Sequence, residues 1–272
     1  MLKFSLGNNK LPKSTMIFSL PAGHSCPGAK DCKSFVNQDP TTGKRTIHDG
    51  PGTKFRCYAA TSEGIYPGVY EARKHNFDLL TPMARAKDVK GMTELILSSM
   101  NQKGMKKVTA VRVHESGDYF SYSYFQAWME VAAVFPNVKF YSYSKSLTHI
   151  LRGKEAGIIP PNFFFTASKG GHFDYLIERG GFKSVTVTTT EGETDAAIAA
   201  GGKFDHDDSL ALGDADFFLQ VHGQQPKGTE AAKFWDRLVK SKRGGYNKKA
   251  KKANGHLIKM DVPKPSKLRK AA

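Results

Sequence analysis

From residue 108 onward, apolar runs with strand character alternate with stretches in which apolar side chains recur at helical spacing. The pattern predicts strands over 108–113, 138–143, 162–166, 184–189 and 217–221, and helices over 122–135, 147–155, 173–179, 193–200 and 229–240. Strands that alternate with helices predict βα units joined into a parallel sheet. This alternation restricts the chain to the α/β class.

The first hundred residues add one more strand to the expected sheet. An apolar run at 16–20 predicts that strand, and helices are expected from 66 to 80 and over 92–100. The turn-rich segment 37–53 is expected to be a surface loop. Six βα units predict a partial or complete TIM-like barrel, with an open doubly wound sheet as the alternative. The chain has neither a Gly-x-Gly-x-x-Gly motif nor a Walker loop, which favours the barrel.

Charge divides the 272-residue chain into two parts. Residues 240–272 hold twelve Lys or Arg and one acid, so they carry +11 of the formal net charge of +16. Residues 1–239, with +5 by subtraction, predict a single α/β barrel-like domain. The basic tail is either an electrostatic arm for nucleic acid or a solubilising terminus.

No apolar run reaches the length of a membrane span, and residues 1–30 lack the pattern of a secretory signal. Three cysteines are few, and an odd number argues against a framework of disulfides. We therefore expect a cytoplasmic protein that does not enter the membrane.

The three cysteines lie in the first quarter of the chain. Cys26 is in a Gly- and Pro-rich loop after the first expected strand, Cys32 is six residues further on, and Cys57 follows the turn-rich segment. Thiolates at these positions could hold an iron–sulfur cluster with one open iron, or a zinc ion with one open position. The wide spacing is atypical of zinc and favours a four-iron cluster, with His24, water or a substrate at the fourth iron. Three unrelated buried thiols are the alternative.

Polar side chains follow the expected strands. Ligands of parallel α/β proteins bind beyond the carboxyl ends of the strands, so we expect these side chains to share one rim. The candidates for catalysis are His114, Glu115, Asp118, His206 and Asp207. The candidates for binding a cofactor are Glu115, Ser144, Lys145, Ser168, Lys169 and His222. The run 205–208, which ends at Asp208, could instead bind a divalent cation and serve a zinc-dependent hydrolase or nucleic-acid-processing enzyme.

Several stretches of the chain resemble a phage-encoded family known as gene product 88. They cover residues 4–12, 20–28, 55–60, 113–120 and 205–209, together with His222-Gly223. The resemblance implies a protein that works in the cytoplasm of a phage-infected cell. It implies no activity.

At greater distance, the layout is similar to that of the radical S-adenosylmethionine enzymes, whose three-cysteine loop follows the first strand of a partial barrel. This resemblance implies that an open iron binds the amino and carboxylate groups of S-adenosylmethionine, and that Glu115-Ser116-Gly117-Asp118 lies where those enzymes hold the amino group. We thus expect an iron–sulfur protein or enzyme that acts on a small molecule or nucleic acid. The alternatives are the zinc-dependent enzyme and a non-enzymatic protein that binds nucleic acid through its tail.

Overall fold

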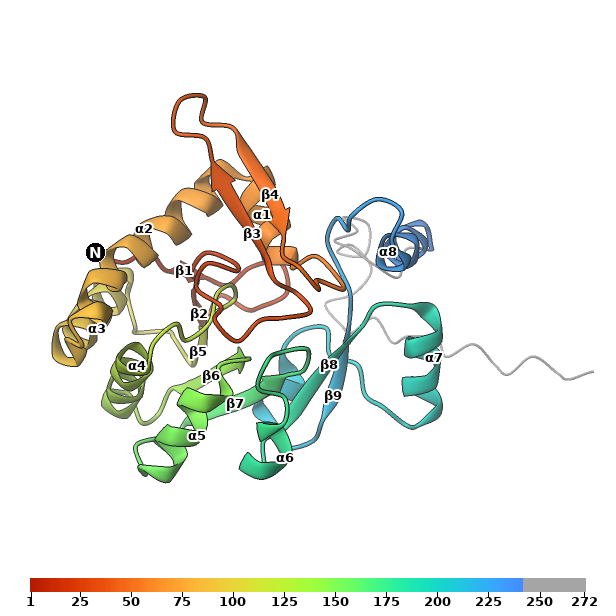
Figure 1. Ribbon diagram of the computed structural model, residues 1–272. Coiled ribbons are helices and arrows are strands. Elements are labelled where there is room, and N and C mark those ends of the chain that lie inside the picture. The colour runs from red at the N-terminus through yellow and green to blue at the C-terminus, as the bar shows by residue number, and fades with distance from the viewer. Residues whose placement is uncertain (242–272) are drawn as a thin grey trace, which may run out of the picture.

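A seven-stranded sheet organises the protein (Figure 1). The structure, a computed structural model, describes residues 1–241. Most of the predicted basic tail, from residue 242 on, lies outside the described residues. The strands are β1 (Ser5–Leu6), β2 (Thr15–Phe18), β5 (Ala110–Val113), β6 (Lys139–Ser144), β7 (Phe163–Ser168), β8 (Ser184–Thr188) and β9 (Phe217–Gln220).

The strands neighbour one another in chain order, β1-β2-β5-β6-β7-β8-β9. All pairs from β2 to β9 are parallel, and only β1 is antiparallel to its neighbour. The prediction of a parallel sheet of βα units is therefore confirmed. The order does not reverse as in a doubly wound sheet, and the described strands form an open sheet rather than a closed barrel.

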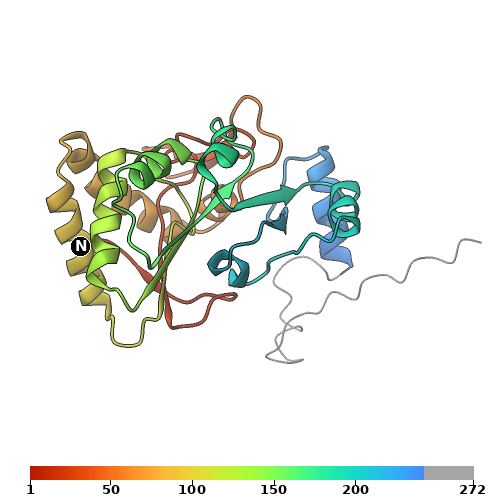
Figure 2. The same cartoon turned by 90° about the horizontal axis from the view of Figure 1, so that it is seen from below.

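Helices follow the parallel strands along the chain and lie along one face of the sheet (Figure 1). They are α1 (Tyr58–Ile65), α2 (Pro67–Arg85), α3 (Val89–Lys103), α4 (Tyr122–Val134), α5 (Leu147–Glu155), α6 (Leu176–Gly180), α7 (Glu191–Ala199) and α8 (Glu230–Lys240). Figure 2 shows α7 and α8 next to each other at the β9 end of the sheet, where Arg237 pairs with Glu191. A 3₁₀ helix, η1 (Ser209–Leu212), precedes β9.

The segment predicted to be a surface loop is instead a β-hairpin. Strand β3 (Ser34–Gln38) pairs with β4 (Arg45–Asp49) in a separate two-stranded sheet that projects from the domain (Figure 1). Val36 and Ile47 pack against Ala59 and Ala60 of α1, which anchors the hairpin. Strand alternation in 34–38 was masked by the turn residues that follow it.

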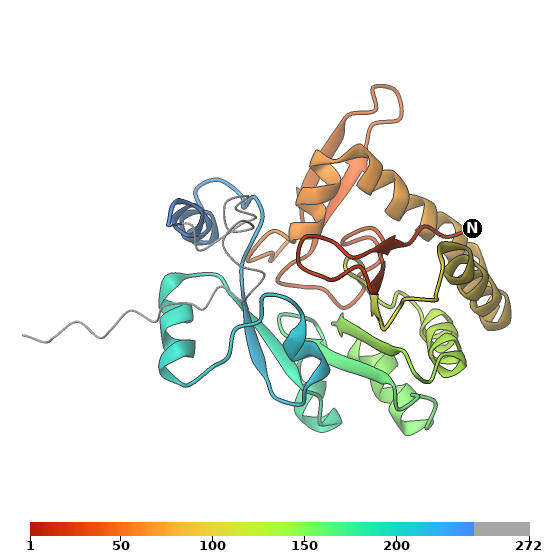
Figure 3. The same cartoon turned by 180° about the vertical axis from the view of Figure 1, so that it is seen from behind.

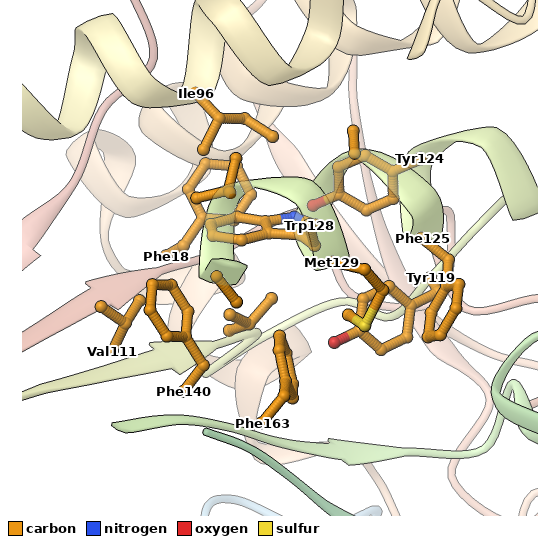
Figure 4. Close-up of a cluster of buried hydrophobic side chains, with 14 of the residues drawn as sticks. Phe18, Ile96, Val111, Tyr119, Tyr124, Phe125, Trp128, Met129, Phe140 and Phe163 are labelled. Carbon is orange, nitrogen blue, oxygen red and sulfur yellow. The ribbon is translucent and has the colours of Figure 1, made fainter. Parts of the chain in front are cut away.

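The main core lies between the sheet and α3 and α4 (Figure 4). Trp128 of α4 is fully buried, and its ring packs edge-on against Phe18 of β2 with centroids 5.3 Å apart. Val111 and Phe140 supply the sheet side of this core. Alternation along each strand turns every second side chain to the other face, so Arg112 points away from the core that Val111 fills.

Among residues 1–241, no helix is both long enough and apolar enough to cross a membrane.

Candidate functional site

The segment from Pro21 to Lys33, which carries Cys26 and Cys32, crosses the carboxyl ends of three neighbouring strands. After β2, the Leu20 N–H donates to the carbonyl of Ser116 beyond β5. Further along, the N–H groups of Lys30 and Asp31 donate to the carbonyl of Gly170 beyond β7, at 3.3 and 2.9 Å. The two cysteines are therefore fixed over the end of the sheet where α/β proteins bind ligands.

A glycine allows the segment to approach β6. A Cβ on Gly28 would lie 2.2 Å from the carbonyl oxygen of Lys145, so no side chain fits there. The Gly28 carbonyl also accepts the N–H of His172 at 2.9 Å, which ties the segment to the loop after β7. Gly28 thus sets the height of the cysteine-bearing segment above the strands.

Hydrogen bonds bring Cys57 to the other two cysteines. The Cys57 N–H donates to Ser34 Oγ at 3.3 Å, two residues after Cys32. Lys33 Nζ donates to the Cys26 carbonyl at 2.8 Å. Lys33 and Ser34 therefore link all three cysteines, although Cys26 and Cys57 are far apart in the sequence.

The three thiols are free and near enough to influence one another's ionisation. Burial raises the pKa of Cys26 well above its ordinary value, and the charges of Asp118, Cys57 and Cys32 raise it further. Burial, then Cys32, raises the pKa of Cys57 to about 12, although the N–H groups of Ala59 and Ala60 in the first turn of α1 oppose this rise. The pKa of Cys32 is raised mainly by burial, and Lys145 opposes the rise. All three groups are neutral thiols at pH 7.

His24 does not face the cysteines, contrary to the prediction that it completes their ligand set. Its ring is exposed and packs edge-on against Phe35, with centroids 5.0 Å apart. Its Nε2 lies 3.1 Å from the carbonyl oxygen of Val36. The side chain of His24 therefore contacts strand β3 of the hairpin, which was not predicted from the sequence.

Asp118 lies beside the cysteine segment and is buried. Its carboxylate accepts hydrogen bonds from Ser144 Oγ at 2.6 Å and from the Lys145 N–H at 2.8 Å. Burial raises its pKa, although these hydrogen bonds oppose the rise. Lys145 Nζ in turn donates to the Ser168 carbonyl, Ser168 Oγ and the Lys169 carbonyl. These side chains lock the ends of β5, β6 and β7 together, and Lys145 uses all three of its donors within the protein.

Glu115 belongs to a buried network of charges. Arg73 donates to Glu63 Oε1 at 2.9 Å and to Glu115 Oε2 at 3.1 Å. Glu63 is fully buried, whereas a quarter of the Glu115 side chain is exposed. Glu63 Oε1 also accepts the Ala22 N–H at 2.9 Å, so the network joins α1 and α2 to the start of the cysteine segment. The partly exposed carboxylate of Glu115 remains accessible to a ligand.

Tyr58 and His222 join this network. The Tyr58 hydroxyl donates to the carbonyl of Glu115, and its ring stacks on His222 with centroids 4.5 Å apart. Burial, with the nearby charge of Lys10, lowers the pKa of His222 to about 4. His222 is therefore neutral at pH 7, and it stacks on Tyr58, the residue that follows Cys57 in the chain.

His114 lies elsewhere. Its ring packs in the core against Tyr119 and Phe18, and its Nε2 is 2.9 Å from the hydroxyl of Tyr124. Burial lowers its pKa to about 3. The expectation that His114 faces the cysteines is wrong, because its side chain extends from the core side of the strand end.

His206 and Asp207 lie at the opposite end of the strands from the cysteines. They belong to the connection before β9, and such connections meet the amino ends of parallel strands. Figure 1 shows the cysteine segment in front of the sheet, whereas η1 lies in front in Figure 3. Asp208 reaches inward, where it pairs with Arg112 and accepts the hydroxyls of Tyr141 and Tyr143 at 3.1 and 3.2 Å.

Within residues 1–241, no group of three or more His, Cys, Asp or Glu side chains is arranged to hold a metal ion. Arg112, Arg73 and Tyr58 also belong to these networks, and none of them was among the predicted site residues. Arg112 had a signal, because a charged residue interrupts an otherwise apolar strand. The sequence held no such signal for Arg73 or Tyr58, since charged residues in helices and aromatic residues are common.

Fold and site together define an α/β protein with an open, mostly parallel sheet, and the segments that carry Cys26, Cys32 and Cys57 lie at the carboxyl edge of that sheet. The sequence profile described as Gene product 88 matches residues 2–252, and the chain belongs to this family. It is 30% identical over 93 residues to the Gene 88 protein of Mycobacterium phage D29, and 29% identical over 93 residues to that of Mycobacterium phage L5. Each match covers 34% of this chain and 39% of the relative. No solved structure matches the chain.

Proposed function

We propose that Cys26, Cys32 and Cys57 hold a four-iron iron–sulfur cluster. Three half-buried thiols from two separate segments, near enough to influence one another's pKa, carry this proposal. Three thiols are the number of protein donors that a cluster with one open iron takes, and His24 is engaged elsewhere. Because the side chains described within residues 1–241 do not form a metal-holding group as they stand, the thiols must turn toward one another when the cluster binds. Each thiol must lose a proton to bind iron, so the raised pKa values imply that cluster assembly releases protons.

The protein's own groups would support such a cluster. The N–H groups at the start of α1 favour the thiolate of Cys57, and the ammonium of Lys145 favours that of Cys32. The three cysteines are only partly exposed to solvent. Hydrogen bonds to sulfur, local charge and solvent exclusion are the features by which proteins tune cluster potentials.

We further propose that the protein is an enzyme similar to the radical S-adenosylmethionine enzymes. Six parallel strands in chain order and a cysteine segment across their carboxyl ends support this. When bound, the cluster supplies one-electron chemistry. Glu115, at the end of the second parallel strand and a quarter exposed, would accept hydrogen bonds from the amino group of the cofactor.

Anaerobic reconstitution tests the cluster. The full chain should bind about four iron and four sulfide ions. It should also absorb broadly at the boundary between the visible and the ultraviolet. Cys26→Ala, Cys32→Ala and Cys57→Ala should each lose most of this iron. His24→Ala is the matched control and should keep it. A colourless protein that binds one zinc ion would instead support the zinc-dependent alternative.

Cofactor binding is tested separately. S-adenosylmethionine should bind the reconstituted protein and perturb the spectrum of its cluster, whereas Glu115→Gln should weaken binding about tenfold. Normal binding by Glu115→Gln would remove this residue from the cofactor site. If S-adenosylmethionine does not change the spectrum of the reconstituted cluster, the protein holds a cluster but does not belong to the proposed class of enzymes.

A further inference from the structure

A cavity of about 480 Å³ lies between β8, α7 and the cysteine segment. Its apolar lining includes Phe55, Ala196, Ala197 and Phe218. Its charged lining comprises Lys54, Lys169, Asp31 and Glu193. The volume falls within the range of small-molecule sites. The cavity is separate from the network of Glu115, Tyr58 and His222.

One wall of the cavity is an uncovered strand edge. Strand β7 pairs with β8 only through Ala167 with Ser184 and Ser168 with Val185. Beyond this point β8 continues to Thr188 while β7 has ended. The upper half of β8 therefore has a neighbour on its β9 side only.

The backbone of Val187 faces this open side. The Val185 carbonyl accepts the N–H of Lys169 on the β7 side, and the Thr188 carbonyl accepts the N–H of Val221 on the β9 side. Peptide groups alternate sides along a parallel strand, so Val187 is the next residue whose N–H and C=O face β7. Within residues 1–241 neither group has a hydrogen-bond partner on that side. They present a donor and an acceptor side by side toward the cavity.

Lys169 gives the cavity its available positive charge. Asp31 is paired with Lys54 at 2.8 Å, and Glu193 accepts the N–H of Thr189 at 2.6 Å and its hydroxyl at 3.0 Å. Both lining acids are thus engaged. Lys169 is exposed, and no described residue accepts a hydrogen bond or forms an ion pair with its Nζ. An anionic group is the natural partner for this ammonium.

We infer that this cavity binds a nucleotide. A flat base fits the apolar walls and pairs its edge with the N–H and C=O of Val187, while the phosphate contacts Lys169. The ammonium of Lys169 favours an anionic phosphate over the cationic sulfonium of S-adenosylmethionine, so the site selects against that cofactor. Asp31 lines the cavity and directly precedes Cys32, which places the ligand beside the proposed cluster. The inference that the nucleotide is a substrate rests on the proposed function. The inference that the cavity binds a nucleotide does not depend on it.

Calorimetry on the full chain, reduced and without iron, tests the site independently of any cluster. The probes are AMP, GMP, CMP and UMP, each compared with its nucleoside. At least one nucleotide should bind more tightly than its nucleoside. Lys169→Gln should weaken that nucleotide about tenfold and leave the nucleoside unchanged. Ala196→Leu should weaken both, because it fills the cavity from an exposed position on α7.

Matched controls are Lys203→Gln, an exposed lysine outside the cavity, and Ala199→Leu, an exposed position of α7 that does not line it. Both should bind like the original protein. The inference is overturned if no nucleotide binds, if Lys169→Gln and Ala196→Leu bind normally, or if S-adenosylmethionine binds there as well as the nucleotide does. Failure here would leave the iron analysis unaffected, and loss of the cluster would leave this titration unaffected.

Discussion

Lys33 Nζ donates to the carbonyl oxygen of Cys26 at 2.8 Å, and it donates equally closely to the carbonyl of Gly23. The ammonium of Lys33 thereby ties the loop that carries Cys26 to strand β3, which begins directly after Lys33. The neighbouring Ser34 holds the N–H of Cys57. The convergence of the thiols depends on these two consecutive residues.

Replacing Lys33 should therefore loosen the cysteine segment. Lys33→Met leaves two carbonyl groups without a charged donor, and each such bond contributes about 1.5–3 kcal/mol. We expect faster alkylation of Cys26 and weaker cluster retention with little change in circular dichroism. Lys30→Met, an exposed neighbour, is the control. Equal alkylation rates in the two variants would show that Lys33 does not hold the segment.

The buried ion network should be sensitive to the loss of one partner. Arg73→Met leaves Glu63 fully buried without its cation, which costs about 3–5 kcal/mol. Urea denaturation should show this loss, and Arg73→Met combined with Glu63→Gln should recover part of it. Lys74→Met breaks the exposed pair with Asp78 on the same helix and should cost less than about 1 kcal/mol. Similar losses for Arg73→Met and Lys74→Met would contradict a buried network.

His114 should make the protein sensitive to acid. Its pKa is about 3 in the folded chain and ordinarily 6.5, so the unfolded chain takes up the proton first as pH falls. The stability that neutral His114 contributes is complete above pH ~6.5 and is lost as pH falls toward about 3, at up to ~1.4 kcal/mol per pH unit. His114→Asn suits the positive φ of this position, +71°. Urea titrations should give this variant a shallower pH dependence between pH 6.5 and 4, and an unchanged slope would exclude this role.

The basic tail remains a prediction, because it lies almost entirely outside the described residues. If about six of its lysines contact phosphates, log affinity for duplex DNA should fall with log salt at a slope of about −5. A chain that ends at Ser241 should keep its fold and lose this binding. Should the shortened chain bind DNA with the same affinity and salt slope, the tail would be a solubilising terminus.

The alternation of strands and helices after residue 108 was readable because it is local. Each predicted strand there overlaps an observed one, and the predicted 147–155 helix coincides with α5. Apolar periodicity depends only on neighbouring residues, which is why it survives without tertiary information. The parallel arrangement followed from the helical connections alone.

The candidate site was only partly readable. Asp118, Lys145 and His222 follow β5, β6 and β9, as the rule that strand ends share one rim assumes, and their roles in a site stay predictions. The rule failed for His206 and Asp207, which precede β9, because a polar run does not show to which end of a strand it belongs. It failed for His114 because the direction of one side chain at a strand end depends on the local backbone, here at positive φ.

The sequence by itself determined the α/β class, the parallel sheet, and the presence of three thiols near its first strand. Only the tertiary structure decided that Lys33 and Ser34 bring Cys26 and Cys57 together, that the hairpin takes His24 away from them, and that Arg73 holds Glu63 and Glu115. Periodicity is a property of adjacent residues, whereas these contacts join residues from 7 to 42 positions apart. Such long-range contacts form only once the sheet has brought their segments to the same edge.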